Sequence, residues 1–243
     1  MLMTSPSLAT KTSGLSLGVL LRGDLDSLTA WLSHWNGRRL AFCLAVIFIG
    51  AGCYGAAMGM WRAPLQALYV AIKFPVIILL TSLANALLNA MLAPLLGLNI
   101  GLRQSFLAIL ISFTIASAIL GAFSPLLAFL VWNAPPLSAA AQVSTTYSVI
   151  LLLQVVLISF AGITANVRLI QLLRRFSSNR AAASRVLFAW LAGNLFFGSQ
   201  LTWIFRPFIG SPGLAVQFLR KDALHGNFYE AVFRSILYLI TRN

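Results

Sequence analysis

Acidic residues are scarce in this chain. Its 243 residues include only four, Asp24, Asp26, Asp222 and Glu230, against 17 lysines and arginines. All four lie outside the long apolar runs, so no carboxylate is expected inside an apolar helix to act as a general base or a proton relay. Membrane enzymes and proton-coupled carriers usually need such a group. We therefore predict a protein that is not an enzyme and that needs no cofactor.

Charged residues of either sign are also few. They make up 9% of the chain, whereas hydrophobic residues make up 60%. A soluble domain is usually about 25% charged and about 45–50% apolar. A water-soluble fold of this composition would lack a charged surface, and this deficit is explained if lipid is the solvent. The predicted fold class is therefore all-α, a polytopic bundle of transmembrane helices.

Residues that form disulfides or bind metals are rare as well. The cysteines, Cys43 and Cys53, are ten residues apart in one apolar run. That spacing is about 15 Å along a helix, which is too far for a disulfide. Asp222, His225 and Glu230 are near one another in a polar stretch, but they lack the fixed frame that a zinc site needs. We predict no metal site.

The amino-terminal stretch lacks the short apolar core and small-residue cleavage site of a signal peptide. We expect the first long apolar run, from Leu40, to be kept as a membrane anchor. Residues 1–15 are small and polar, and we expect them to be disordered. Apolar residues at helical spacing from Leu21 to Trp35 predict a short helix. It would lie either at the membrane interface or against the bundle.

Five apolar runs are long enough to cross the hydrocarbon, which takes about 20 helical residues. The predicted spans are 40–60, 74–96, 105–132, 145–167 and 186–205. Residues 64–73 form a predicted lead-in to the second span, with Lys73 reaching the interface. The predicted domains are a cytoplasmic tail with an interfacial helix (1–39), a five-span bundle (40–205), and a post-membrane turn and amphipathic helix (206–243).

Basic residues lie at the edges of the apolar runs and form no separate basic domain, so we predict no nucleic-acid partner. Five spans would put ten lysines and arginines on the amino-terminal side of the membrane and seven on the other. The positive-inside rule then places the N-terminus in the cytoplasm. Residues 168–185 form a predicted basic loop, in which Arg174 and Arg175 could contact anionic lipids. A plain topology signal would explain these arginines equally well.

Polar and small residues within the spans indicate close helix packing. Asn85 and Asn89 are four apart and share a helix face. They could line a substrate path, but we favour hydrogen bonds between helices. Gly55 and Gly59 form a Gly-x-x-x-Gly pattern, which allows two helices to approach closely. We favour packing within the bundle here over a homodimer contact.

The last predicted span ends in Arg206–Pro207–Phe208–Ile209–Gly210–Ser211–Pro212. At a membrane boundary, Arg206 could hold a phosphate or cap helix carbonyls. Pro207 and Pro212 bracket a rigid turn, with Gly210 between them, that could fold back onto the mouth of the bundle.

This motif, with the following pair Asn227–Phe228, resembles the closing segment of a family of uncharacterised bacterial polytopic membrane proteins. The resemblance implies the bacterial inner membrane and names no activity. The layout of spans also resembles Yip-type membrane proteins, which would imply a scaffold role. We therefore expect a non-catalytic membrane scaffold or subunit that binds a partner membrane protein, a second copy of itself or anionic lipids. The alternative is a transporter or channel for a small solute.

Overall fold

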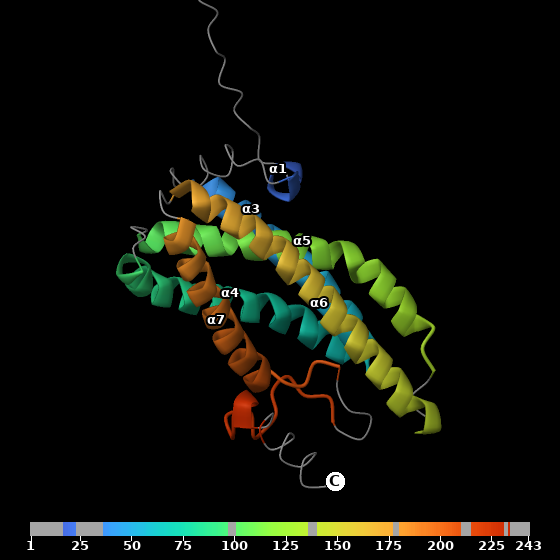
Figure 1. Ribbon diagram of the computed structural model, residues 1–243. Coiled ribbons are helices and arrows are strands. Elements are labelled where there is room, and N and C mark those ends of the chain that lie inside the picture. Colours follow the sequence, from blue (N-terminus) through green and yellow to red (C-terminus); the bar gives the residue numbers. More distant parts are fainter. Residues whose placement is uncertain are drawn as a thin grey trace, which may run out of the picture.

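The computed structural model describes residues 17–22, 36–96, 101–135, 140–176, 180–209, 215–230 and 233. Within these ranges the long elements are all helices, and the chain forms no strand (Figure 1). They are α1 (Leu17–Arg22), α3 (Gly37–Met60), α4 (Pro64–Leu95), α5 (Leu102–Trp132), α6 (Ala140–Phe176) and α7 (Arg180–Ile204). The predicted all-α class is confirmed.

Four of the described helices contain a segment long and apolar enough to cross a membrane. These segments are Gly37–Met60, Pro64–Leu92, Leu102–Trp132 and Val149–Gln171. The sequence predicts five spans, one more than this criterion supports. The difference is α7, a helix of 25 residues whose hydropathy is lowered by Asn194, Ser199 and Gln200.

Two predicted boundaries are wrong. The lead-in and the second span form one helix, α4, which begins at Pro64 and continues through Pro75. Proline suits a first helical turn because the N–H groups there have no intrahelical partner, and transmembrane helices tolerate an internal proline. The predicted loop at 168–185 is mostly helical, because α6 continues to Phe176 and α7 begins at Arg180. Arginine is itself a good helix former.

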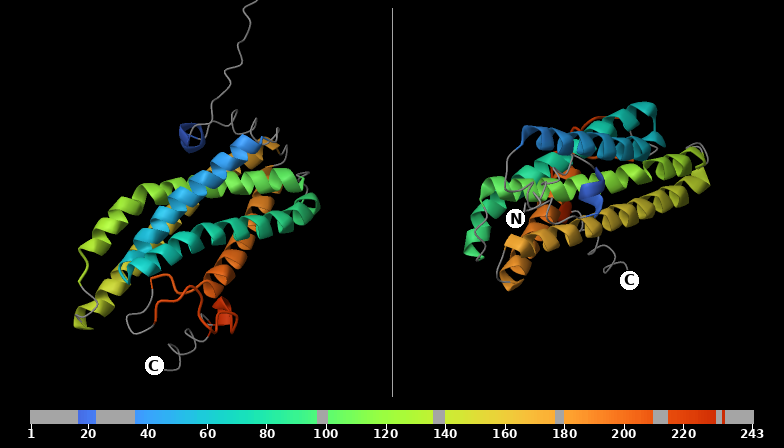
Figure 2. Two further views of the ribbon diagram at one scale, coloured as in Figure 1. Left: turned by 180° about the vertical axis from the view of Figure 1, so that it is seen from behind. Right: turned by 90° about the horizontal axis from the view of Figure 1, so that it is seen from above.

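The helices pack in layers. α4 and α5 contact each other in the middle, and α3 packs against both from one side. On the other side, α6 packs on α5 and α7 packs on α4, while α6 and α7 contact each other only a little. Figure 2 shows α5 between α3 and α6 in the view from above. In Figure 1, α6 and α7 meet near their connection and diverge toward the other end of the bundle.

Glycines bring α3 close to its neighbours. A Cβ atom added at Gly55 would lie 2.6 Å from the carbonyl oxygen of Val70 on α4, and one at Gly121 would lie 2.7 Å from the Cα of Gly50. A Cβ at Gly59 would lie 2.7 Å from the Gln66 carbonyl oxygen. The Gly-x-x-x-Gly pattern therefore packs α3 against α4 within the bundle, as predicted.

The described part of the amino-terminal helix lies against the bundle. α1 contacts α5, and Leu20 is fully buried in the core cluster that α5 forms with α3. This favours docking on the bundle for residues 17–22. The rest of the predicted helix, up to Trp35, and the predicted disorder of residues 1–15 lie outside the described residues.

Candidate functional site

A cavity of about 650 Å³ lies between α4, α6, α7 and the turn that follows α7; we call it the α6–α7 cleft. Its wall on α6 runs from Leu151 to Asn166 and its wall on α7 from Leu191 to Arg206. Fifteen helical residues rise about 22 Å, so the cleft covers most of a hydrocarbon layer of about 30 Å.

The α6–α7 cleft is mainly apolar and open on one side. Its apolar walls include Phe74, Ile77, Phe113, Leu151, Val155 and Leu195. Two of these, Val155 and Leu195, are 54% and 72% exposed. Because no other described helix covers this side, the cleft opens laterally between α6 and α7. In a membrane, such an opening faces lipid chains.

Arg206 and Arg220 line the cleft where the chain leaves α7. The guanidinium of Arg206 lies 3.8 Å from the centre of the Trp203 ring and donates to the Trp203 carbonyl oxygen at 2.8 Å. It also forms an ion pair of 3.2 Å with Asp222, whose side chain is largely exposed. Lys221 lies beside these residues, so this end of the cleft has a net positive charge.

The described part of the turn after α7, Pro207 to Ile209, docks on α4. The carbonyl oxygen of Pro207 accepts hydrogen bonds from Lys73 Nζ at 3.0 Å and Gln66 Nε2 at 2.9 Å. Gln66 Nε2 also donates to the Phe208 carbonyl oxygen at 2.6 Å. Pro207 itself is buried, and its peptide bond with Arg206 is cis.

Lys73 does not reach the interface as predicted; its side chain is fully buried. The C-terminal turn covers it, and the rings of Phe208 and Phe218 lie 5.9 Å and 5.1 Å from its ammonium nitrogen. No carboxylate forms an ion pair with Lys73 in the described part of the chain. A carbonyl dipole and ring faces thus replace the water that snorkelling would supply. An ionisable residue held this way within a span suggests a functional site.

The two asparagines predicted to share a face are both fully buried. Asn85 Nδ2 donates to the Trp190 carbonyl oxygen at 3.0 Å and to Asn194 Oδ1 at 2.6 Å. Asn89 Nδ2 donates to the Asn85 carbonyl oxygen at 2.7 Å. Asn85 thus joins α4 to α7, and neither asparagine lines the cleft. The interhelical hydrogen bonding that we favoured holds for Asn85, whereas the bonds of Asn89 stay within α4.

Other polar groups do face the cleft. Thr81 Oγ1 and Gln154 Nε2 have no hydrogen-bond partner among the described residues, although Thr81 and Gln154 are only 3% and 4% exposed. Asn166 Oδ1 is also buried without a partner, near the end where α6 and α7 converge. Burying a polar group without a partner costs about 1–3 kcal/mol. Buried, unpartnered groups that line a cavity therefore point to a ligand that would satisfy them.

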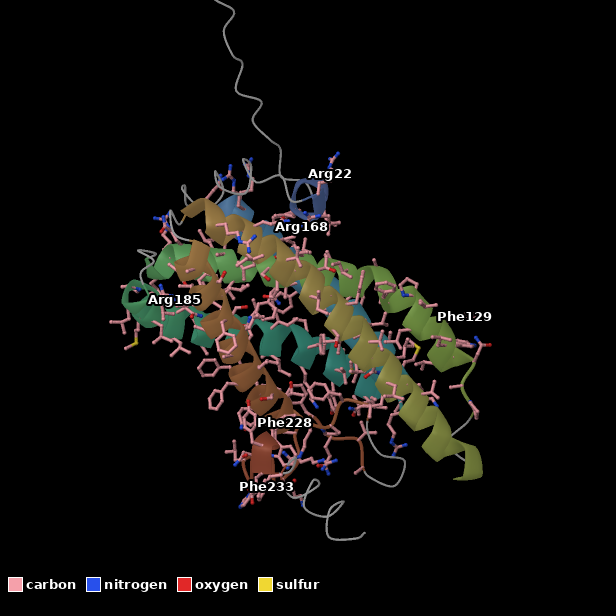
Figure 3. The ribbon with its side chains drawn as sticks, in the orientation of Figure 1. Arg22, Phe129, Arg168, Arg185, Phe228 and Phe233 are labelled. Carbon is pink, nitrogen blue, oxygen red and sulfur yellow. The ribbon has the colours of Figure 1, made fainter. Side chains whose placement is uncertain are left out.

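Of the remaining predicted site residues, Arg174 does not line this cleft and is exposed near the far end of α6. Figure 3 shows Arg168 and Arg185 toward that end of the bundle, away from Phe228 and Phe233 beyond the end of α7. The side chain of Arg175 and residues Gly210 and Pro212 lie outside the described residues, as does any basic loop surface that needs them.

The segment after the turn packs against the end of α7. Tyr229 stacks on Phe196 with ring centroids 5.9 Å apart, and its hydroxyl lies 3.0 Å from Ser199 Oγ. The backbone N–H of Glu230 donates to Asn227 Oδ1 at 2.8 Å. Asn227 thus caps the start of the helical stretch at Phe228. Most of the predicted final helix lies outside the described residues.

A second cavity, of about 540 Å³, lies between α4 and α5 near the other end of the bundle. Leu83, Leu87, Leu102, Arg103 and Phe106 line it. Arg103 is its charged residue, and none of its lining residues carries a buried polar side-chain atom without a partner. It therefore offers fewer groups for ligand recognition than the α6–α7 cleft.

Sequence reasoning missed the roles of Gln66 and Arg220. Gln66 and Lys73 are seven residues apart, so they share a helix face, and this spacing could have indicated a joint role. Arg220 follows a stretch with no periodic pattern. Nothing in the sequence indicates that it returns to the end of α7 beside Arg206.

Comparisons with protein-family models, with curated proteins and with solved structures give no match to this chain. The resemblance of the 206–212 motif to an uncharacterised bacterial family therefore stays a prediction, as does the likeness to Yip-type proteins. The geometry of the α6–α7 cleft is therefore the best indication of function.

Proposed function

We propose that this protein is a non-catalytic, multi-pass subunit of the bacterial inner membrane that binds an anionic lipid in the α6–α7 cleft. The observation that carries the proposal is the position of Arg206 and Arg220 at one end of a long, laterally open, apolar cavity. Lipid chains suit the apolar walls, and a phosphate suits the guanidinium groups, which bind it with charge-assisted hydrogen bonds.

The topology that we propose has five spans, with α7 as the fifth. α7 has 25 residues, about 37 Å of helix, and Asn85 binds it to α4 with hydrogen bonds that need no water. Of the polar residues that lower its hydropathy, Asn194 faces α4 and the cleft. The N-terminus is then cytoplasmic by the positive-inside rule. Arg206 lies on the opposite side of the membrane.

The test is a lipid-binding measurement on the full chain in detergent micelles, by native mass spectrometry with phosphatidylglycerol and phosphatidylcholine. The wild type should prefer phosphatidylglycerol. A basic residue near an anionic headgroup contributes about 1 kcal/mol, so Arg220→Gln should lower this preference about fivefold. Arg206→Gln should lower it further, although this change also removes the contacts of Arg206 with Trp203 and Asp222.

The matched control is the double variant Arg174→Gln/Arg185→Gln. Both arginines are exposed near the opposite end of the bundle, and the double variant removes more charge than Arg220→Gln. It should leave the preference for phosphatidylglycerol unchanged. If Arg220→Gln and the control lowered the preference for phosphatidylglycerol equally, lipid binding would depend on overall charge. The proposal would then be wrong.

A second candidate function is transport of an amphiphilic solute along the cleft. The specific observation in its favour is the spread of polar groups, from Arg206 at one end through Thr81 and Asn194 to Asn166 near the other. Uptake or release of labelled lipid by vesicles that contain the protein would distinguish the two functions. A binding subunit leaves the lipid distribution unchanged, whereas a transporter changes it.

A further inference from the structure

The inside of the α6–α7 cleft carries hydrogen-bond donors that the arginines at its mouth do not explain. Gln154 on α6 and Thr81 on α4 each line the cleft, and each is almost fully buried. Gln154 Nε2 and Thr81 Oγ1 have no partner in the described part of the chain. An amide N–H and a hydroxyl both donate, so together they suit a ligand with acceptor oxygens within its apolar body.

The spacing of Thr81 from the mouth follows from the rise of α7. The guanidinium of Arg206 stacks over Trp203, and a Cβ atom at Gly198 would lie 4.0 Å from Thr81 Oγ1. Trp203 and Gly198 are five residues apart, a rise of about 7.5 Å. A glycerophospholipid places its ester carbonyls a few bonds from its phosphate, which is a separation of the same scale.

We infer that the α6–α7 cleft recognises an acyl-ester lipid at two points. The arginines at the mouth bind the phosphate, and Gln154 and Thr81 donate hydrogen bonds to the ester carbonyl oxygens. This inference rests on the proposed function and adds the lipid class to it: a diacyl glycerophospholipid with at least one chain inside the cleft. A headgroup bound only at the surface would leave both buried donors unsatisfied.

Thr202 provides a comparison within the same cavity. It also lines the cleft, but its hydroxyl donates to the Gly198 carbonyl oxygen at 2.7 Å. Its hydrogen-bonding need is therefore met by its own helix, as is common for threonine in helices. Thr81 is also on a helix, yet its hydroxyl has no such bond. The difference marks Thr81 as the threonine available to a ligand.

The experiment compares dioleoyl phosphatidylglycerol with its analogue in which both chains are joined by ether bonds. The two lipids have the same headgroup and the same chain length, and they differ in the carbonyl oxygens. The full-length wild type in detergent micelles should bind the ester lipid at least about fivefold more tightly, the effect of one neutral hydrogen bond. Native mass spectrometry with both lipids present gives this ratio directly.

The double variant Gln154→Leu/Thr81→Val should bring the ester-to-ether ratio to about one. Thr202→Val, the matched control, should keep the wild-type ratio. Arg220→Gln should lower the preference for phosphatidylglycerol over phosphatidylcholine but keep the ester-to-ether ratio. This separates the recognition point at the mouth from the point inside the cleft.

The outcomes separate this inference from the proposed function. A wild type that prefers phosphatidylglycerol but binds ester and ether lipids equally would overturn the inference alone. A wild type with no preference for phosphatidylglycerol would overturn the proposed function and the inference with it. An ester preference that survives in Gln154→Leu/Thr81→Val would show that other residues contact the carbonyl, and the assignment of these two donors would be wrong.

Discussion

The two sides of this bundle are packed in different ways. On one side, α3 lies against α4 and α5 through glycines, and backbone nearly touches backbone at Gly50 and Gly121. On the other side, α6 and α7 rest on different helices and diverge, which leaves the α6–α7 cleft. In the most apolar part of α3, 44% of the residues are buried, whereas in that of α6 only 28% are buried. The close side therefore acts as a frame, and the open side leaves space for a ligand.

In this chain, the closely packed helices and the candidate binding residues lie on different sides of the bundle. Close helix contact in lipid needs small residues, because the hydrophobic effect does not drive helices together there. The side on which glycines bring backbone against backbone is the side with little internal space. Along α6 and α7, the cleft is instead lined mainly by branched aliphatic residues, with polar groups placed singly among them. Binding chemistry is thus found where packing is loose.

The largest effect that we expect comes from breaking the close side. In Gly50→Val, the new Cβ would overlap the carbonyl oxygen of Ser117 on α5, so α3 and α5 must separate. Overpacking against backbone costs about 3 kcal/mol or more, and we expect little folded protein by size-exclusion chromatography in detergent. The matched control is Gly162→Val on α6, where an added Cβ meets nothing within 4 Å. Equal yields of folded protein for the two variants would contradict the comparison.

A smaller effect should follow from reversing the charge of Lys73, which holds the turn at the end of the open side. In Lys73→Glu, a carboxylate would face the Pro207 carbonyl oxygen and the ring of Phe218. The variant loses a hydrogen bond from a charged group, about 1.5–3 kcal/mol, and gains repulsion. We expect trypsin to cleave at Arg220–Lys221 at least about tenfold faster.

Lys73→Met is the control for this variant. The Pro207 carbonyl oxygen keeps its hydrogen bond from Gln66, and the loss of a buried charge offsets much of the cost. We expect cleavage slightly faster than in the wild type but much slower than in Lys73→Glu. If Lys73→Glu were as resistant to trypsin as Lys73→Met, then Lys73 would not hold the turn on α4.

The smallest effect concerns the attachment of α7 to α4. Asn85→Leu removes the hydrogen bonds to the Trp190 carbonyl oxygen and to Asn194. Interhelical hydrogen bonds in membranes average about 0.6 kcal/mol. Loss of the two bonds should therefore lower the free energy of unfolding by about 1–2 kcal/mol, as measured by thermal unfolding in detergent. Asn133→Leu, at the exposed end of α5, should have almost no effect. A similar loss in both variants would mean that Asn85 does not attach α7.

Much of the fold could be predicted from composition and local pattern. The lack of charge predicts a membrane bundle, and the Gly-x-x-x-Gly pattern at Gly55 and Gly59 predicts close packing of α3. The boundaries of the helices could be predicted less accurately. A proline such as Pro75 stops a helix in water far more often than in a membrane, and arginines near a span can extend a helix as readily as end it. For these reasons, the predicted start of the second span and the predicted loop at 168–185 are wrong.

The site was harder to predict, because its parts are distant in sequence. Arg206 and Pro207 were recognised as a boundary motif, and the structure places both at the α6–α7 cleft. Arg220 comes to the same place only because the chain turns back beneath α7. Asn85 and Asn89 share a face, but periodicity does not identify the helix that the face meets.

The sequence by itself determined the solvent of this protein and the class of its fold, since those depend on summed composition and on periodicity along a single helix. Only the tertiary structure decided that Lys73 is buried beneath the turn. It also decided that Thr81 and Gln154 lie beside a cavity with polar atoms that no described residue satisfies. The physical reason is that burial and hydrogen bonding of one side chain depend on which other helix lies opposite. Here that follows from α6 resting on α5 while α7 rests on α4.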